Sequence, residues 1–499
     1  MTSKKKIILI MFLFFCSMIY AQKPVVYYSQ YAQKSQKDHA ASLTKFLQDV
    51  SKKNAVGVID GYTIGFDKEV SIKNLNNVEL SFKNSVLYSN KRFSGFFLNF
   101  VNSNNIVIDG INVEMYRTAL PVYIEKDYPN IYNSALGFKG CQNIEIKNSK
   151  FLNLYNRSVQ VTESSGKISV HDNIFSSKKQ NQKYLIEHVV IGSSPNGAVS
   201  IIKNKFENES YDNPDFGISA ISGYGLGKIN GKVDIIDNYI NNAGRSNAGL
   251  HRLFAIDFYD DCDNITVKGN TISNVMWGAV RFNGSSENTV IADNIITIKN
   301  PDDSSSITSS TTAGNRNFRN ISISNNTITA ISGLNSAIML QNQFENVKTE
   351  NILIKNNKIN NSYNNISLIG YFDDVSISQN IIKGTKAAVG ISFMLKNKYG
   401  NKQIYINDNI IHTFNTGISL NSMDNKANNN DFTIRNNEVN TTNKSFKGYG
   451  IIVNLGMKGK IDIEQNNIFN FATGLYLREN TVNMKLNKFD GNARNLSKD

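Results

Sequence analysis

Apolar and polar residues alternate in short runs along most of this chain, and one phrase recurs about every 28 residues. Alternating β-branched residues precede an asparagine and another short apolar run follows it, as in Ile265-Thr266-Val267 before Asn270. Thirteen asparagines mark the repeat: Asn148, Asn173, Asn204, Asn238, Asn270, Asn294, Asn326, Asn357, Asn380, Asn409, Asn437, Asn466 and Asn487. Alternation with period 2 is typical of strands that bury one face. A repeat of this length is typical of a solenoid.

A third apolar run follows in many repeats, with a small residue first and then apolar residues at alternate positions. Examples are Ala135-Leu136-Gly137-Phe138, Ala255-Ile256-Asp257-Phe258, Ala279-Val280-Arg281-Phe282, Gly417-Ile418-Ser419-Leu420 and Gly474-Leu475-Tyr476-Leu477. Three short strands per repeat predict an all-β fold, a right-handed parallel β-helix of roughly 13–16 coils. An ordinary β-sandwich would give no reason for an asparagine at this spacing.

The repeated asparagine is expected at a turn, for two reasons. Its backbone tolerates the left-handed region, which turns often require. Its side-chain amide both donates and accepts, so amides stacked one per coil can bond along the column.

The two ends of the chain differ from the repeat. Residues 1–21 resemble a signal peptide, with three lysines before an apolar run that is too short to span a bilayer comfortably. Residues 22–60 are expected to contain a short amphipathic helix capped by Asp38, with Leu43, Phe46, Leu47 and Val50 on one face. That helix would cover the open first coil. The β-helix is expected over residues 61–499, in an exported protein that is periplasmic or extracellular.

Residues 40 to 490 resemble the pectin-lyase-like superfamily of right-handed β-helices, which includes polysaccharide lyases and glycoside hydrolases. The resemblance is specific for the fold. Asp260-Asp261-Cys262 resembles one polygalacturonase motif, but the other three motifs of that family are missing, so it assigns no catalytic residue here.

The charge and composition of the chain favour some classes of binding partner over others. The formal net charge of +13 favours anionic partners such as uronic-acid or sulfated glycans. Basic residues are spread along the repeats and are not interleaved with aromatic residues, which argues against nucleic acid. Outside the signal peptide, Cys141 and Cys262 lie about four coils apart in the repeat, beyond disulfide reach, so both are expected to be free and buried.

The candidate site combines outward charge with long loops. On the third strand of each repeat most outward positions are small or neutral, whereas Asp257 and Arg281 are charged and lie on adjacent coils. The three repeats between Asn173 and Asn270 are also long, and longer loops on neighbouring coils would wall a groove. The predicted catalytic residues are Asp257, Asp260, Asp261 and Arg281. The predicted substrate-binding residues are Glu187, His188, Tyr224, Arg245, His251, Arg252, Tyr259, Trp277 and Asn283.

Structural roles are open alternatives for these residues. Asp257 and Arg281 could form an ion pair between coils that stabilises little. The two aspartates after them could cap a turn, and Trp277 could be a packed turn residue as readily as a sugar-stacking one.

Three functions fit this cluster. Glycoside hydrolysis needs two carboxyl groups, which Asp257 with Asp260 or Asp261 would supply while Arg281 holds a substrate anion. A polysaccharide lyase could instead hold Ca²⁺ on the three aspartates, with Arg281 or a nearby Lys, His or Tyr as the base. Ca²⁺ is the only cofactor that the sequence suggests. The third function is non-catalytic glycan binding or a surface-structural role. Hydrolysis is favoured because carboxylates outnumber plausible bases.

Overall fold

The computed structural model describes most of the chain between residues 23 and 498. The described ranges are 23–89, 93–115, 134–154, 156–177, 184–192, 197–209, 216–223, 231–244, 254–258, 263–284, 286–299, 305–310, 317–330, 336–342, 344, 347, 349–361, 364–384, 389–395, 402–423, 427–441, 448–478 and 482–498.

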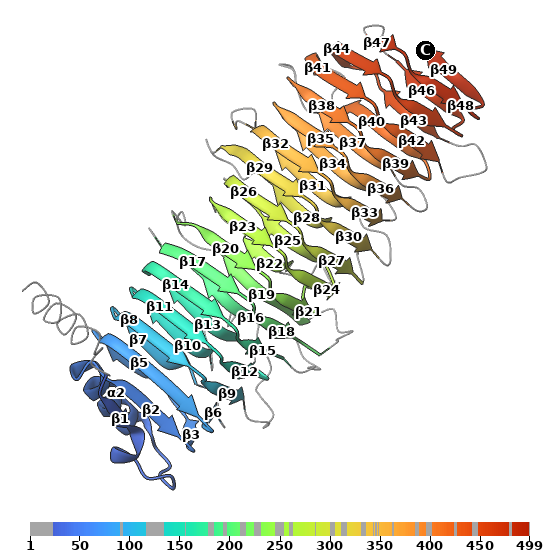
Figure 1. The fold of residues 1–499 in the computed structure, drawn as a ribbon. Helices are drawn as coiled ribbons and strands as arrows, with labels where there is room; N and C mark the ends of the chain where they lie inside the picture. The colour runs from blue at the N-terminus through green and yellow to red at the C-terminus, as the bar shows by residue number, and fades with distance from the viewer. Residues whose placement is uncertain are drawn as a thin grey trace, which may run out of the picture.

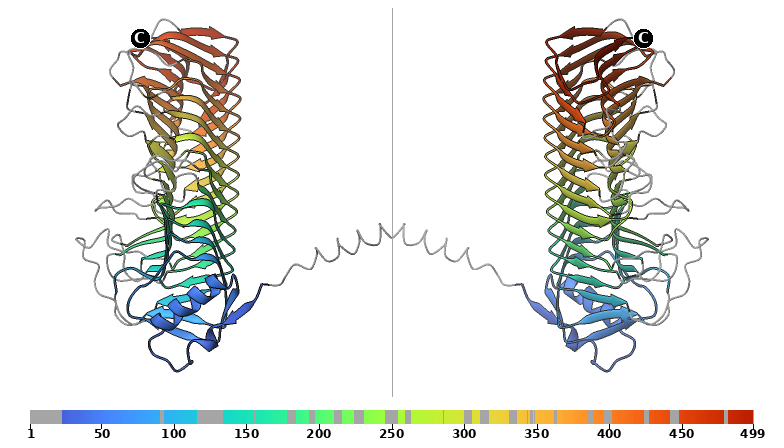
Figure 2. Two further views of the ribbon diagram at one scale, coloured as in Figure 1. Left: turned by 90° about the vertical axis from the view of Figure 1, so that its left-hand side faces the viewer. Right: turned by 90° about the vertical axis from the view of Figure 1, so that its right-hand side faces the viewer.

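The described chain winds into a long right-handed parallel β-helix, seen from three sides in Figures 1 and 2. Three parallel sheets of 17, 16 and 16 strands, named A, B and C here, run the length of the column. Each coil contributes one strand to A, then one to B and one to C. The expected fold and coil number are confirmed.

Strand bounds follow the repeat closely. Sheet A contains β1 (Val25–Tyr27), β2 (Val56–Asp60), β5 (Asn76–Lys83), β8 (Asn104–Asp109), β11 (Gln142–Lys147), β14 (Ser165–His171), β17 (Gly197–Ile202), β20 (Val233–Ile236), β23 (Ile265–Lys268), β26 (Ser286–Ala292), β29 (Phe318–Ser324), β32 (Thr349–Lys355), β35 (Val375–Ser378), β38 (Ile404–Asn407), β41 (Ala427–Arg435), β44 (Met457–Glu464) and β47 (Val482–Lys485). Sheet B contains β3 (Thr63–Phe66), β6 (Val86–Ser89), β9 (Asn112–Met115), β12 (Lys150–Leu152), β15 (Ile174–Phe175), β18 (Lys205–Glu207), β21 (Tyr239–Asn241), β24 (Thr271–Val275), β27 (Ile295–Ile298), β30 (Thr327–Ala330), β33 (Lys358–Asn361), β36 (Ile381–Gly384), β39 (Ile410–Thr413), β42 (Glu438–Thr441), β45 (Asn467–Phe469) and β48 (Lys488–Asp490). Sheet C contains β4 (Val70–Lys73), β7 (Phe96–Val101), β10 (Ser134–Lys139), β13 (Arg157–Thr162), β16 (Tyr184–Ile191), β19 (Phe216–Gly223), β22 (Phe254–Phe258), β25 (Gly278–Phe282), β28 (Ser305–Ser310), β31 (Ser336–Asn342), β34 (Asn364–Gly370), β37 (Val389–Leu395), β40 (Thr416–Ser422), β43 (Tyr449–Val453), β46 (Thr473–Leu477) and β49 (Arg494–Lys498).

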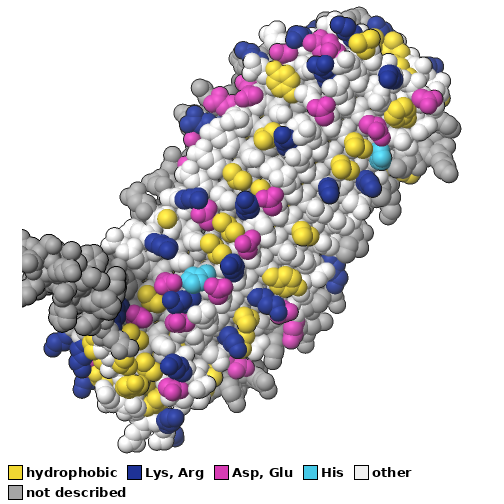
Figure 3. All heavy atoms as spheres, viewed as in Figure 1, with side chains coloured by type: hydrophobic (Ala, Val, Ile, Leu, Met, Phe, Trp, Pro, Cys, Tyr) yellow, Lys and Arg dark blue, Asp and Glu magenta, His cyan; other side chains and the backbone are white. Residues whose placement is uncertain are grey.

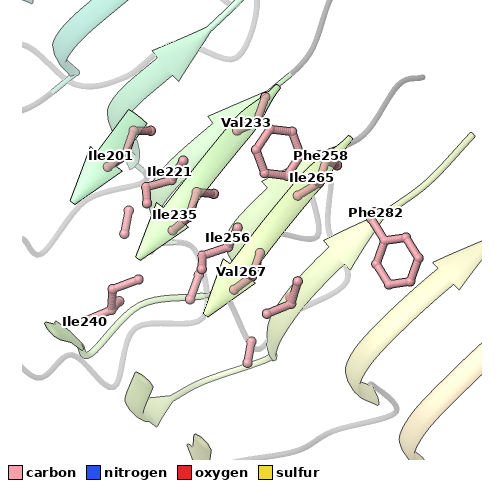
Figure 4. Close-up of a cluster of buried hydrophobic side chains, with 14 of the residues drawn as sticks. Ile201, Ile221, Val233, Ile235, Ile240, Ile256, Phe258, Ile265, Val267 and Phe282 are labelled. Carbon is pink, nitrogen blue, oxygen red and sulfur yellow. The ribbon is translucent and has the colours of Figure 1, made fainter. Parts of the chain in front are cut away.

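The core is one continuous column of inward side chains. Because every coil repeats the alternation, like residues stack on like: Phe151, Phe175 and Phe206 lie parallel at ring-centroid distances of 4.9 and 4.7 Å. Figure 4 shows how side chains of neighbouring coils, such as Ile235 and Val267, share this interior. Burial of this kind supplies the main driving force for folding.

A buried ladder of side-chain amides follows the turn between sheets A and B. Twelve asparagines, from Asn173 to Asn487, take part. At Asn204 the backbone N–H and Nδ2 both donate to Oδ1 of Asn238, at 2.9 and 3.1 Å. Nδ2 also donates to the Val170 carbonyl oxygen at 2.8 Å, so the amide joins three coils. The expected bonding along the column is confirmed.

One of the two reasons for expecting asparagine at this turn, its tolerance of left-handed backbone, was wrong. Left-handed backbone falls on the residue before each ladder position, such as Asp172 (φ 56°) and Asp293 (φ 58°). Asn148 is such a residue (φ 51°), and Ser149 occupies the ladder position, where its N–H donates to Asn173 Oδ1 at 2.9 Å. The ladder therefore selects asparagine for its amide, and the turn strain is carried one residue earlier.

The helix α2 (Ala40–Lys52) covers the first coil, as expected. Leu43, Phe46, Leu47 and Val50 are its buried face. The close approach requires a glycine below it, since a Cβ at Gly57 would lie 2.7 Å from Phe46 Cζ. The cap differs in detail: the helix begins after His39, and Asp38 Oδ1 accepts the Ala40 N–H at 2.9 Å.

Two further expectations bear on the described chain. Cys141 is free and buried, and its thiol lies 3.3 Å from the Phe100 carbonyl oxygen, whereas Cys262 lies outside the described residues. In the described part of the chain, no helix has the length and apolar character needed to cross a bilayer.

Replacing one rung of the ladder should destabilise the protein measurably. In Asn326→Ala, the backbone N–H of Asn294 loses its acceptor and the Ile291 carbonyl oxygen loses the Asn326 amide as a donor. Asn294 Nδ2 loses one of its two acceptors and keeps the Val267 carbonyl oxygen. Each buried group left unpaired costs about 1–3 kcal/mol. We expect a clear fall in the urea midpoint of unfolding, whereas Asn360→Ala, on the exposed side of β33, should leave it nearly unchanged. Equal effects of the two substitutions would contradict a stabilising ladder.

Candidate functional site

Asp257 and Arg281 lie on the outer face of sheet C. Ile256 and Phe258, on either side of Asp257, and Phe282, next to Arg281, belong to the buried core, as Figure 4 shows. Asp257 is paired with Arg281 in the register of β22 and β25. The predicted register is therefore correct at this point.

These two side chains form a forked ion pair. Arg281 Nε donates to Asp257 Oδ1 and Nη2 donates to Oδ2, both at 2.7 Å. The guanidinium also lies 4.8 Å from the ring centroid of Phe254. The side chains are only 5% and 12% exposed, so the pair is largely removed from water. Arg281 is thereby held by Asp257 and is poorly placed to bind a substrate anion.

A second ion pair lies on the same face, three coils nearer the N-terminus. Arg157 and Glu187 are paired in the register of β13 and β16. Arg157 donates from Nε and Nη2 to Glu187 Oε2 at 3.2 and 3.1 Å, and from Nη1 to Gln160 Oε1 at 2.7 Å. Both side chains are less than 8% exposed. Glu187 is a predicted site residue, whereas Arg157 is not. The sequence around Arg157 gives no sign of its partner, which lies on the next coil.

The coil between the two pairs contributes Ser222. It is one coil from Asp257 in register and lies beside the Glu187 carboxyl, near enough to favour its ionised form. Its hydroxyl is buried, yet it makes no hydrogen bond of normal geometry among the described residues. We name the five residues Arg157, Glu187, Ser222, Asp257 and Arg281 the sheet C cluster. Such a buried hydroxyl between two carboxyl groups is suited to hold a water molecule or a ligand hydroxyl.

Burial makes both carboxyl groups weaker acids. It raises the pKa of Glu187, which the negative charge of Asp257 raises further, while Arg157 acts in the opposite direction. Burial also raises the pKa of Asp257 against the opposing effect of Arg281. Each carboxyl group thus lies in an environment that can hold a proton above the usual carboxyl range.

His188 lies inside the column, which corrects its prediction as a substrate-binding residue. It is fully buried, near the rings of Phe175 and Phe206, and both ring nitrogens have partners, Ser158 Oγ at 3.1 Å and Asn208 Oδ1 at 2.9 Å. Burial lowers its pKa to about 4, so it is neutral at physiological pH. The repeat contains a signal for this burial. His188 directly precedes Val189, and the residue at the same point of other third strands is small, as at Ala255 and Ala279, so this position faces the interior.

The other predicted binding residues have mixed outcomes. Trp277 is 3% exposed, which is too little for a sugar-stacking platform, so the alternative of a packed turn residue holds. Asn283 is half-buried, and its Oδ1 accepts the Ser310 N–H at 3.0 Å. Seven predicted site residues lie outside the described residues: Tyr224, Arg245, His251, Arg252, Tyr259, Asp260 and Asp261.

No group of metal ligands is found among the described residues. No three His, Cys, Asp or Glu side chains in those ranges are arranged to hold a metal ion. Both oxygens of Asp257 accept hydrogen bonds from Arg281, so the one described member of the suggested Ca²⁺ site is already engaged. Acidic and basic side chains are interspersed over the face that Figure 3 shows, and they form no single charged patch there.

Comparison with known proteins gives the fold. No family model matches this chain, and no curated protein matches it. Among solved structures, the tailspike of E. coli bacteriophage HK620, solved with a pentasaccharide, is 12% identical with a TM-score of 0.45 and covers 93% of this chain and 78% of its own. The surface adhesin PfbA of Streptococcus pneumoniae is 10% identical with a TM-score of 0.38, over 95% and 93%. The A-module of Azotobacter vinelandii mannuronan C-5 epimerase AlgE6 is 10% identical with a TM-score of 0.34, over 95% and 99%. Likeness at this level is one of fold alone, and it carries no argument for function.

The raised pKa of Glu187 predicts a pH-dependent stability. An acid whose folded-state pKa is raised stabilises the fold below the unfolded pKa, about 4.3 for glutamate, and this stabilisation is lost as the pH rises through the folded-state pKa. Glu187→Gln keeps an acceptor for Arg157 and cannot ionise. Relative to the native protein, this variant should therefore gain stability as the pH is raised from 4 toward neutrality. Melting temperatures across that interval test this, and a relative loss of stability would mean that Arg157 dominates and lowers the pKa.

Proposed function

We propose that this chain is an exported, glycan-active β-helix protein that cleaves a glycosidic bond by hydrolysis at the sheet C cluster. The observation that carries the proposal is the arrangement of Glu187 and Asp257. Their strands, β16 and β22, are two coils apart, roughly 9–10 Å along the axis at about 4.7–4.9 Å per coil. Glu187 stands three residues before Val190, the register equivalent of Asp257 on its coil, and the charge of Asp257 still reaches the Glu187 carboxyl group. Inverting glycosidases hold their two carboxyl groups about 6.5–9.5 Å apart to leave room for a water molecule.

The environments of the two carboxyl groups suggest their roles. Glu187 is buried beside the negative charge of Asp257, which favours the protonated acid. Burial raises the pKa of Asp257 as well, but Asp257 accepts two bonds of 2.7 Å from Arg281, whereas the bonds from Arg157 to Glu187 are 3.1 and 3.2 Å. Of the two carboxyl groups, Asp257 is therefore the better placed to act as the carboxylate. In the proposed reaction Glu187 donates its proton to the glycosidic oxygen as the bond to the anomeric carbon breaks. Asp257 takes a proton from the water whose oxygen attacks that carbon, and Ser222 is placed to orient this water.

Two features bear on the alternatives. Elimination is less well supported, because Arg281 is fully protonated and bound to Asp257, and therefore an unpromising base. The low exposure of all four charged side chains favours a second candidate, a non-catalytic glycan-binding or surface-structural β-helix in which the pairs only join coils.

The charges of the cluster give no preference for an anionic glycan. Two guanidinium groups balance two carboxyl groups. The whole-chain charge of +13 is the remaining reason to expect anionic substrates, and an export route rests on the sequence of residues 1–21 alone.

A polysaccharide panel with carboxyl variants tests hydrolysis. Neutral and acidic polysaccharides would be digested, with reducing ends and ultraviolet absorbance of unsaturated products read in parallel. We expect reducing ends without absorbance, and a fall of about 10²–10⁴-fold in rate for Glu187→Gln and for Asp257→Asn, because each removes a general acid or base.

The matched control is Asp293→Asn, which alters an exposed ion pair between coils, with Lys268 at 3.7 Å, away from the cluster. It should retain the native rate. Both cluster substitutions disturb a buried ion pair, so circular dichroism checks that each variant is folded. New absorbance would mean elimination. Full activity in folded Glu187→Gln and Asp257→Asn, or no cleavage of any polysaccharide, would reject the proposed hydrolysis.

A further inference from the structure

A second surface feature lies on the edge where sheet C turns into sheet A. It is an open groove of about 500 Å³ that crosses five coils at the strands β29, β32, β35, β38 and β41. Its lining is entirely polar or charged: Arg319, Asn320, Glu350, Asn351, Asp373, Asp374, Lys402, Gln403 and Asp431. None of these residues belongs to the sheet C cluster.

The turn geometry fixes this lining at one-coil intervals. Asn320, Asn351, Asp374 and Gln403 all have left-handed backbone, with φ between 52° and 57°. Each therefore stands at the same point of its coil, and Asn351 Nδ2 donates to Asn320 Oδ1 at 2.7 Å. The result is a regular row of hydrogen-bonding side chains spaced about 4.8 Å apart.

Several groups in the groove have unused hydrogen-bonding capacity. Among the described residues, the Asp374 carboxylate, the Lys402 ammonium and the Gln403 amide have no side-chain partner, and all three are exposed. Arg319 Nε is buried without a partner there, although its other nitrogens lie near Glu287 and Glu350. Donors and acceptors thus converge on the same space, as they do in sites for small polar ligands.

The charge of the groove selects the ligand. Arg319 and Lys402 oppose four carboxylates, Glu350, Asp373, Asp374 and Asp431, which gives a net charge of −2 in a chain of net charge +13. A local negative charge repels uronic or sulfated glycans. The groove offers no apolar face, so a ligand must bind through hydroxyl groups that donate and accept.

We propose that this groove is a non-catalytic binding site for a neutral polysaccharide chain. The chain would lie along the column, with its hydroxyl groups bonded to the row from Asn320 to Gln403 and to Lys402. This inference extends the proposed function, because the groove would hold a glycan away from the sheet C cluster where cleavage is proposed.

Binding of defined polysaccharides to paired variants tests the groove. Isothermal titration calorimetry at physiological salt would compare neutral laminarin and mannan with anionic alginate. The variant Asp374→Gly/Lys402→Ala removes two hydrogen-bonding side chains, and glycine accepts the left-handed backbone at position 374. We expect at least a tenfold loss of affinity for the neutral polysaccharide that the native protein binds.

The control variant is Asp408→Gly/Lys383→Ala. Asp408 has the same left-handed backbone (φ 58°) but stands at the turn between sheets A and B, and Lys383 is exposed on sheet B. This variant should bind as the native protein does. An equal loss in both variants, no loss in the groove variant, or native binding to alginate alone or to none of the three would overturn the inference.

Failure of the groove and failure of the proposed hydrolysis give different results. If folded Glu187→Gln and Asp257→Asn still cleave while the groove variant loses binding, the groove stands and the proposed catalytic cluster falls. If these two variants lose cleavage while the groove variant binds and cleaves as the native protein does, the cluster stands and the groove falls.

Discussion

The whole structure depends on one constraint, the one-coil register of its parallel strands. Each position in a coil lies about 4.8 Å above its equivalent in the coil below, so each side chain contacts the side chain at the same position of the neighbouring coil. For apolar residues this is favourable, as the stacked rings of Phe151, Phe175 and Phe206 show. For a buried polar residue it is tolerable only if the side chain can bond to its own copy. Asparagine meets this condition because its amide donates on one side and accepts on the other.

The same register is unfavourable for charge. A carboxylate directly above another carboxylate is repelled, so charged residues on the faces must meet opposite charges on the next coil. Arg157 lies next to Glu187, and Asp257 lies next to Arg281. The coil between Glu187 and Asp257 carries Ser222, a small neutral side chain. Glu187 and Asp257 therefore stand two coils apart with one neutral coil between them, and the proposed hydrolysis rests on this arrangement.

Most of the fold could be predicted from the sequence because the same pattern of apolar and polar residues recurs in every coil. The period, the three strands and the buried face of α2 each follow from patterns of several residues, and errors at one coil are corrected by the others. The errors that remained concern single positions. Asn148 was aligned one residue early, because its own ladder position holds Ser149 and the local phrase looks the same. His188 was placed outside, because the third strand of its coil was aligned without the small residue that marks the inward corner.

The candidate site was less predictable, because it depends on pairing between distant segments. Asp257 and Arg281 could be found, since their coils share an obvious phrase. Arg157 and the groove at Asp374 and Lys402 could not, since each residue alone resembles an ordinary exposed polar residue and gains meaning only from its neighbours one coil away. In a solenoid, chemistry is therefore concentrated at departures from the repeat. One such departure is a buried pair of opposite charges on a face where most outward side chains are small or neutral. The other is a groove with a net negative charge on a chain with a net positive charge.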